Sequence, residues 1–275
     1  MKLYVDPGHG GNDPGAQGNG LNEKDITLDI AQRIRSILLN DYEDAEVMMS
    51  RTDDAAKSLS QRTNEANAWG AQFYLSIHIN SGPSSALGYE DYIYSGLPDS
   101  AATAKYQDFL HEEIAKLNQL ADRGQKRANF HVLRESAMPA LLSENGFISN
   151  AHDSELMKQP SWRQNVAQGH ANGLARAFGL SRKAAPAPAP APNPAPGPGK
   201  LYKLIAGSFT SIENANNRAA SLHSQGIEAF VKAVTISGKT WYRVQAGAFS
   251  SPENAQAHLG QIRQAGYSDA FLIAE

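Results

Sequence analysis

The chain has 275 residues, of which 41% are hydrophobic and 19% are charged. This is an ordinary globular composition, and the length exceeds one typical domain, so two domains are expected. No apolar run is long enough to span a bilayer, which predicts no membrane insertion. The start MKLYVDPGHGG also lacks the apolar segment of a signal peptide. Two explanations stay open: the numbering begins at a mature N-terminus, or the protein leaves the cell by another route, such as lysis.

The sequence contains no cysteine, so disulfides and thiolate metal sites are excluded, and any metal must be bound by His, Asp or Glu. The formal net charge is −3, but residues 1–180 hold 16 Lys and Arg against 23 Asp and Glu, which gives −7. An acidic region of this size without an Arg-rich stretch argues against a nucleic-acid partner.

Short apolar runs alternate with helical patterns in residues 1–180. Strands are predicted at 2–6, 45–50, 71–79, 89–95, 129–133 and 139–144, and helices at 26–39, 58–69, 103–120 and 161–178. This alternation predicts an α/β fold in which a mixed, largely parallel sheet is flanked by helices. Ligands of such sheets bind outside the carboxyl ends of the strands.

Residues 183–200 read KAAPAPAPAPNPAPGPGK, a composition that buries no core and favours extended polyproline II geometry. We therefore predict a first domain at 1–180, a linker at 181–200 and a second domain at 201–275.

An internal repeat marks the second domain. LYKLIAGSFTSIENA at 201–215 aligns with WYRVQAGAFSSPENA at 241–255, and a β-rich run follows each copy, which predicts a small α+β domain of βαββαβ order. Alternation along the strands puts Tyr202, Leu204, Tyr242 and Val244 under the helices. The same alternation puts three polar residues on an open sheet face: Lys203, Arg243 and Gln245.

Several residues that can carry chemistry fall at the carboxyl ends of predicted strands. His9 follows the first strand, His78 lies near the end of the third, and Glu144 ends the last. Asn80 lies two residues after His78, and therefore on the same face, which makes it a candidate substrate contact. These side chains are expected to meet at one edge of the sheet.

Glu23 supplies a fourth candidate from a helix start. Asn22 is a plausible N-cap before apolar positions with helical spacing, so Glu23 is expected at the first helical position. The positive end of the helix dipole keeps a carboxylate ionised there.

Two His and one carboxylate with an open fourth position form a ligand set that catalytic zinc sites use. His9, Glu23 and His78 are the candidate ligands for Zn²⁺, and Glu144 is the candidate general base. Asp6, Asp13 and His131 stay open as alternative ligands.

Five motifs, in this order, carry a resemblance to a known family: DPGHGG at 6–11, the Glu23 helix start, RTD at 51–53, SIHIN at 76–80 and PALLSENGFISN at 139–150. Together they resemble the zinc-dependent N-acetylmuramoyl-L-alanine amidases of bacterial cell wall turnover, most of all the sporulation-associated, mother-cell-lysis type. The resemblance covers residues 1–180 and implies that His9, Glu23 and His78 bind zinc and that Glu144 is the catalytic glutamate. It implies a secreted or wall-associated hydrolase, or one held in the mother-cell cytoplasm until release.

Residues 201–275 resemble a SPOR domain, a peptidoglycan-binding module of two such half-repeats. The resemblance implies binding to glycan strands, and Lys203, Ser208, Arg243 and Gln245 are the expected contacts.

Three other functions compete with an amidase. Glu23 and Glu144 could be the acid and base of a metal-free glycosidase. The first domain could dock a partner without catalysing any reaction. A nucleotide-binding loop is the weakest alternative, because YVDPGHGGNDPG lacks GxGxxG spacing. Arg51 is expected to organise a loop.

Overall fold

The computed structural model describes residues 1–183, 201–224, 226–265, 267 and 269–274. The chain divides into two compact units, Met1–Lys183 and Ala184–Glu275, each with its own sheet and hydrophobic core. Beyond Lys183, the predicted linker at 181–200 lies outside the described residues, so the domain boundaries remain a prediction. In the described part of the chain, no helix is long and apolar enough to cross a membrane.

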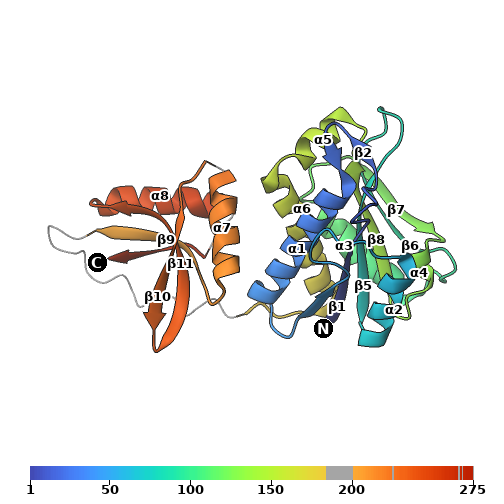
Figure 1. Ribbon diagram of the computed structural model, residues 1–275, viewed down its shortest axis with the longest axis horizontal. Helices are drawn as coiled ribbons and strands as arrows, with labels where there is room; N and C mark the ends of the chain where they lie inside the picture. Colours follow the sequence, from blue (N-terminus) through green and yellow to red (C-terminus); the bar gives the residue numbers. More distant parts are fainter. Residues whose placement is uncertain (184–200, 225, 266, 268, 275) are drawn as a thin grey trace. The chain divides into compact units, whose positions relative to one another are not determined.

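The first unit is an α/β domain (Figure 1). Its strands are β1 (Lys2–Pro7), β2 (Gln17–Gly18), β3 (Leu21–Asn22), β4 (Glu46–Met49), β5 (Phe73–Asn80), β6 (Tyr89–Tyr94), β7 (Asp122–Ala128) and β8 (Ala140–Phe147). Its helices are α1 (Glu23–Asp41), α2 (Leu59–Trp69), α3 (Ala102–Ala115), α4 (His131–Arg134), α5 (Ala151–Met157) and α6 (Pro160–Phe178).

The main sheet has the order β4-β1-β5-β8-β6-β7. All neighbouring strands run parallel except β6 and β8, which are antiparallel. This confirms the predicted mixed, largely parallel sheet. The strands β1, β5 and β8 are buried almost throughout because helices cover both faces of the sheet, which is why their sequences read as continuous apolar runs.

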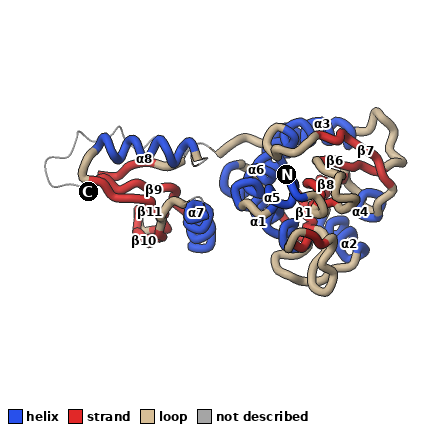
Figure 2. Tube along the Cα trace, turned by 90° about the horizontal axis from the view of Figure 1, so that it is seen from above, coloured by secondary structure: helices blue, strands red, loops and turns tan. Residues whose placement is uncertain are grey.

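Helices form a layer on each side of the sheet (Figure 2). On one side α6 packs against α1 and α3, and their apolar side chains meet those of β1 and β5 in the larger core. On the other side α2 and α4 pack together over a smaller core that includes Tyr4, Tyr74 and Leu142. Each fully buried Leu or Ile in these cores contributes about 1.5–3 kcal/mol to folding.

The predicted strand at 129–133 is wrong. His131–Arg134 forms the short helix α4, and the edge strand β7 lies just before it at Asp122–Ala128. A short apolar run such as NFHVL does not separate a strand from a buried helical turn. The strand DRGQKRA has no apolar alternation because it lies at the sheet edge, where most of its residues are exposed or half-buried. The helix predicted at 103–120 ends earlier, at Ala115.

The second unit has the predicted βαββαβ order (Figure 1). Its elements are β9 (Tyr202–Phe209), α7 (Ile212–Ser224), β10 (Phe230–Ile236), β11 (Lys239–Phe249), α8 (Pro252–Gln264) and β12 (Phe271–Ala274). The sheet is antiparallel with the order β10-β11-β9-β12, and its core contains Leu204 and Val244 as expected, with Tyr242 packed against it.

Candidate metal centre and catalytic cleft

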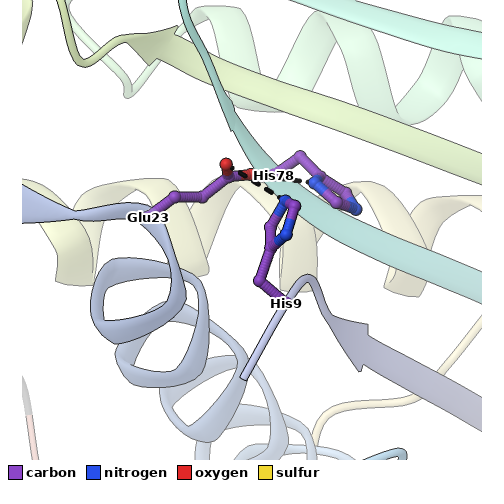
Figure 3. Close-up of side chains that lie close together, drawn as sticks. All are labelled: His9, Glu23 and His78. Atoms are coloured by element: carbon purple, nitrogen blue, oxygen red, sulfur yellow. Dashed lines mark hydrogen bonds and ion pairs between the residues drawn. The ribbon is translucent and has the colours of Figure 1, made fainter. Parts of the chain in front are cut away.

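Three side chains from different elements converge at the carboxyl edge of the main sheet. His9 follows β1, Glu23 is the first residue of α1, and His78 lies on β5 (Figure 3). One ligand atom from each of the three lies within 4.8 Å of the other two, and no other His or acidic residue in the described ranges joins this group. The residues predicted from their strand ends and helix start are therefore brought together.

Glu23 is the centre of this group. Its Oε1 lies 2.8 Å from Nδ1 of His78, and its Oε2 lies 3.1 Å from Nε2 of His9. Backbone N–H groups also donate to it, from Ile79 to Oε1 at 3.0 Å and from Ala16 to Oε2 at 2.8 Å. Burial alone would raise the pKa of Glu23, but the hydrogen bonds from His78 and His9 hold it far below its usual value. The carboxylate is ionised at neutral pH.

His9 is held in an unusual backbone conformation, with φ of 62°. Two buried arginines fix the chain around it: Arg51 donates to the carbonyl oxygens of Pro7 and Gly8, and Arg62 donates to those of Pro7 and His9. Arg51 therefore organises the loop, as expected. Sequence reasoning missed Arg62, since no local pattern marks a helix residue that reaches this loop.

The position of the His78 ring explains why residue 8, next to His9, is a glycine. A Cβ atom at this position would lie 2.3 Å from Cε1 of His78, so any other residue would displace that ring. Gly15 has a similar role, because its Cβ would lie 2.6 Å from both Glu23 Oε2 and His9 Cδ2. The glycines let the backbone approach the three side chains closely.

The alternative ligands have other partners. Asp6 is buried and pairs with Arg62 at 2.5 Å while accepting a hydrogen bond from Tyr74. His131 lies with its Nε2 3.5 Å from Thr63 Oγ1. Asp13 lies 2.8 Å from Nδ1 of His9, which leaves Nε2 of that ring directed at Glu23.

Glu144 lies on β8, in register with His78 on β5 and with Glu90 on β6. Its Oε2 is enclosed and has no hydrogen-bond partner among the described residues. Burial raises the pKa of Glu144 well above its usual value, and the charges of Glu23 and Glu90 raise it further. An enclosed carboxyl without a partner is characteristic of a group that handles protons and not of a structural contact.

A cavity of about 470 Å³ is lined by His9, His78 and Glu144, together with Gly8. The apolar side chains of Leu59, Phe130, Val132 and Leu142 line it as well. Leu59 and Phe130 are unusually exposed for large apolar side chains, which is typical of a binding cleft.

Asn80, the candidate substrate contact, is occupied within the protein. Its Nδ2 donates to Oε1 of Glu90 at 2.9 Å, and its Oδ1 accepts from the backbone N–H of Ser81. Glu90 was missed from the sequence because it lies near the start of β6. Since β6 runs antiparallel to β8, its amino end lies beside the carboxyl end of β8.

The four candidate contacts in the second unit lie on β9 and β11. Ser208 and Arg243 are cross-strand partners, and the Oγ of the first and the Nε of the second are enclosed without a hydrogen-bond partner in the described chain. Lys203 is half-buried. The prediction that Gln245 lies on an open sheet face is wrong: it is only 8% exposed, and its side chain donates to the carbonyl oxygen of Gly247. The strand register shifts on either side of it.

Both units are similar to known proteins. Residues 3–176 match the family model described as N-acetylmuramoyl-L-alanine amidase, and residues 198–274 match the SPOR domain. The chain is 49% identical over 231 residues to the N-acetylmuramoyl-L-alanine amidase CwlM of Bacillus licheniformis, which covers 84% of each chain. It is 48% identical over 232 residues to the sporulation-specific N-acetylmuramoyl-L-alanine amidase of Bacillus subtilis, again with 84% of each covered.

Among solved structures, the catalytic domain of the amidase CwlV from Bacillus (Paenibacillus) polymyxa superimposes with a TM-score of 0.62 and 35% sequence identity. The match covers 66% of this chain and all of that domain. The chain therefore belongs to the N-acetylmuramoyl-L-alanine amidase family, carries a peptidoglycan-binding SPOR domain, and cleaves the amide between N-acetylmuramic acid and L-alanine.

Proposed function

We propose that His9, Glu23 and His78 hold a zinc ion and that Glu144 is the general acid and base of the amidase reaction. The fit of zinc rests on the donor set: two imidazoles and an ionised carboxylate within 4.8 Å of one another, in a chain without cysteine. When bound, zinc would polarise a carbonyl oxygen and lower the pKa of water to about 7.

The observation that carries the role of Glu144 is its enclosed, unpartnered Oε2, in a residue that lines the cavity and lies in register with His78. This carboxylate would take the proton of the attacking water and pass it to the nitrogen of the departing L-alanine. Both transfers need a group that is not itself a ligand, and Glu144 lies outside the three-residue group.

Neighbouring residues would keep the geometry fixed during these transfers. Asp13 would hold the His9 ring through Nδ1, so that Nε2 stays available as the ligand atom. Arg51 and Arg62 would hold the loop that carries His9, because both donate to its carbonyl oxygens.

Glu144→Gln tests this mechanism, since it keeps the size of the side chain and removes its proton chemistry. We expect release of alanine amino groups from purified walls to fall by about 10²–10⁴-fold while the zinc content stays at that of the wild type. His9→Ala and His78→Ala should lose zinc and activity together.

Two results would overturn the mechanism. A Glu144→Gln enzyme with unchanged activity would remove Glu144 from the reaction. Activity that survives complete chelation, in protein shown to hold no metal, would remove zinc. Release of reducing sugars in place of amino groups would support the glycosidase alternative instead.

For the second unit, we infer that Ser208 and Arg243 contact the glycan directly, with Lys203 and Gln245 beside them on β9 and β11. The position of the first pair supports this role, because Ser208 and Arg243 are cross-strand partners and each side chain is half-buried, not fully covered. We infer a catalytic domain at 1–180, a linker at 181–200 and a wall-binding domain at 201–275. The likeness to a sporulation-specific amidase supports action on the mother-cell wall, with the enzyme wall-associated once released.

A further inference from the structure

A row of charged side chains continues from Glu144 across the next two strands of the main sheet. Glu90 on β6 is the cross-strand partner of Glu144 and is only 3% exposed. Its Oε2 accepts hydrogen bonds from two residues of β7, Arg123 Nε at 2.6 Å and Lys126 Nζ at 2.5 Å. Its Oε1 accepts from Asn80 and from the hydroxyl of Tyr92 at 2.6 Å.

Arg123 and Lys126 carry two positive charges and Glu90 carries one negative charge, so the three residues together have a net charge of +1. Residues 1–180 as a whole have a net charge of −7. Arg123 and Lys126 are 37% and 35% exposed, so a ligand can reach both. Within the described residues Arg123 donates to Glu90 and to the carbonyl oxygen of Leu87, which leaves N–H groups of its five available. Glu90 holds the two cations in place, and Arg123 also stacks over the Phe147 ring.

The cavity itself offers no such excess. The Lys and Arg side chains that line it, Lys57 and Arg62, are paired with Glu65 and Asp6 respectively. An anionic group on the substrate is therefore attracted toward β7 and not toward α2.

The distance between β8 and β7 suits a stem peptide whose cleaved amide lies beside Glu144. Two strand separations place β7 about 10 Å from β8. An extended peptide advances about 3.4 Å per residue, so the cations lie two to three residues beyond the cleaved amide. We propose that Arg123 and Lys126 bind a carboxylate of the stem peptide beyond L-alanine, and so select substrates by the charge of that residue. This inference rests on the proposed role of Glu144, because that residue sets where the peptide starts.

Two muramoyl dipeptides that differ in one group test the proposal on the full-length, zinc-loaded enzyme; in both, the γ-carboxyl of the second residue is capped as a methylamide, so that only the α position differs in charge. MurNAc–L-Ala–D-Glu has a free α-carboxylate, and MurNAc–L-Ala–D-isoGln has an amide in its place. We expect the wild type to cleave the carboxylate form with kcat/KM about tenfold higher, which corresponds to about 1.4 kcal/mol.

Arg123→Gln and Lys126→Gln should each reduce this ratio about threefold, and the double variant should bring it close to one. The loss should fall on the carboxylate substrate, with the amide substrate changing little. Arg127→Gln is the matched control: it removes the same charge from the neighbouring residue, whose side chain pairs with Asp99, and should keep the wild-type ratio.

Because the ratio compares two substrates on one preparation, it does not depend on the fraction of a variant that is folded. A wild type that cleaves both substrates equally, or variants that lose the same factor on both, would overturn the proposal. So would an Arg127→Gln enzyme that loses the preference as fully as the double variant. These outcomes are independent of the zinc and Glu144 tests, which are read from metal content and from the effect of Glu144→Gln.

Discussion

Asp13 illustrates how an exposed residue can matter to a metal site. Its carboxylate accepts from Nδ1 of His9 at 2.8 Å, yet its side chain is 65% exposed. Outer partners of this kind orient a ligand and raise its basicity, and their loss commonly weakens metal binding by about 10–100-fold.

Asp13→Ala should therefore bind zinc about 10–100-fold more weakly, with little change in the free energy of unfolding of the metal-free protein. Competition with a chromophoric chelator measures the affinity, and thermal unfolding measures the stability. Asp99→Ala, which removes an exposed carboxylate on another loop, should leave the affinity unchanged. Equal zinc affinity in wild type and Asp13→Ala would show that the contact with His9 has no effect on metal binding.

At this scale the sequence predicted the residues that mark element ends. His9 follows a strand, His78 lies near the end of another, and Glu23 begins a helix, so simple topology places them at one edge. Glu144 was predicted to end its strand, but β8 continues to Phe147. It could not predict Arg62, which reaches Asp6 across 56 positions of the chain, because only the folded packing brings the two together. Nor could it tell that Asp13, and not Asp6, lies beside His9.

The elements β6, β7 and α3 are joined by a buried charged contact. His111 on α3 lies 2.7 Å from Asp91 on β6 and 3.1 Å from Asp122 on β7. Burial opposes the charged ring, but the two carboxylates outweigh it and raise the pKa of His111 from 6.5 to about 8. The protonated ring therefore stabilises this part of the sheet.

This pKa predicts how stability depends on pH. A histidine whose pKa is higher in the folded than in the unfolded protein stabilises fully below pH 6.5, and this contribution is lost as the pH rises through about 8. Urea unfolding of the wild type at pH 6 and pH 9 should show a loss, of which His111 accounts for up to about 2 kcal/mol.

His111→Gln supplies the comparison, at equal zinc content. It should be less stable than the wild type at pH 6, and the difference between the two should shrink by pH 9. A difference that stays constant from pH 6 to pH 9 would mean that the charge of His111 does not contribute.

The same region shows where prediction of elements fails. β7 is a polar edge strand whose pairing depends on β6, and nothing in DRGQKRA reveals a neighbour. α4 covers the smaller core through Val132 and Leu133, and this burial gives its sequence the apolar character of a strand. The buried elements were predicted well because their apolar periodicity reflects the core directly.

For the whole molecule, a wall-binding unit should act by raising the local enzyme concentration on an insoluble polymer. Arg243→Gln in the full-length chain should weaken binding to purified walls and slow their lysis, while kcat/KM on a soluble muramoyl peptide stays unchanged. Co-sedimentation measures the first effect and amino-group release the second.

Lys116→Gln, an equal charge change at the C-cap of α3 in the first unit, should behave like the wild type in both assays. If Arg243→Gln binds walls as tightly as the wild type does, Arg243 is not a glycan contact. If it slows soluble cleavage too, its effect is not confined to attachment.

The way the chain leaves the first unit has a consequence for access to the polymer. Lys183 donates its backbone N–H to the carbonyl oxygen of Asp41, the last residue of α1, whereas Glu23 is the first. With 19 residues in α1, the exit point lies about 27 Å from the metal-binding edge. Lys183 thus lies at the end of α1 away from the metal-binding edge, and the chain does not block that edge where it leaves the unit. A glycan strand that offers no free end can therefore approach the metal-binding edge along its length without meeting the point where the chain leaves this unit.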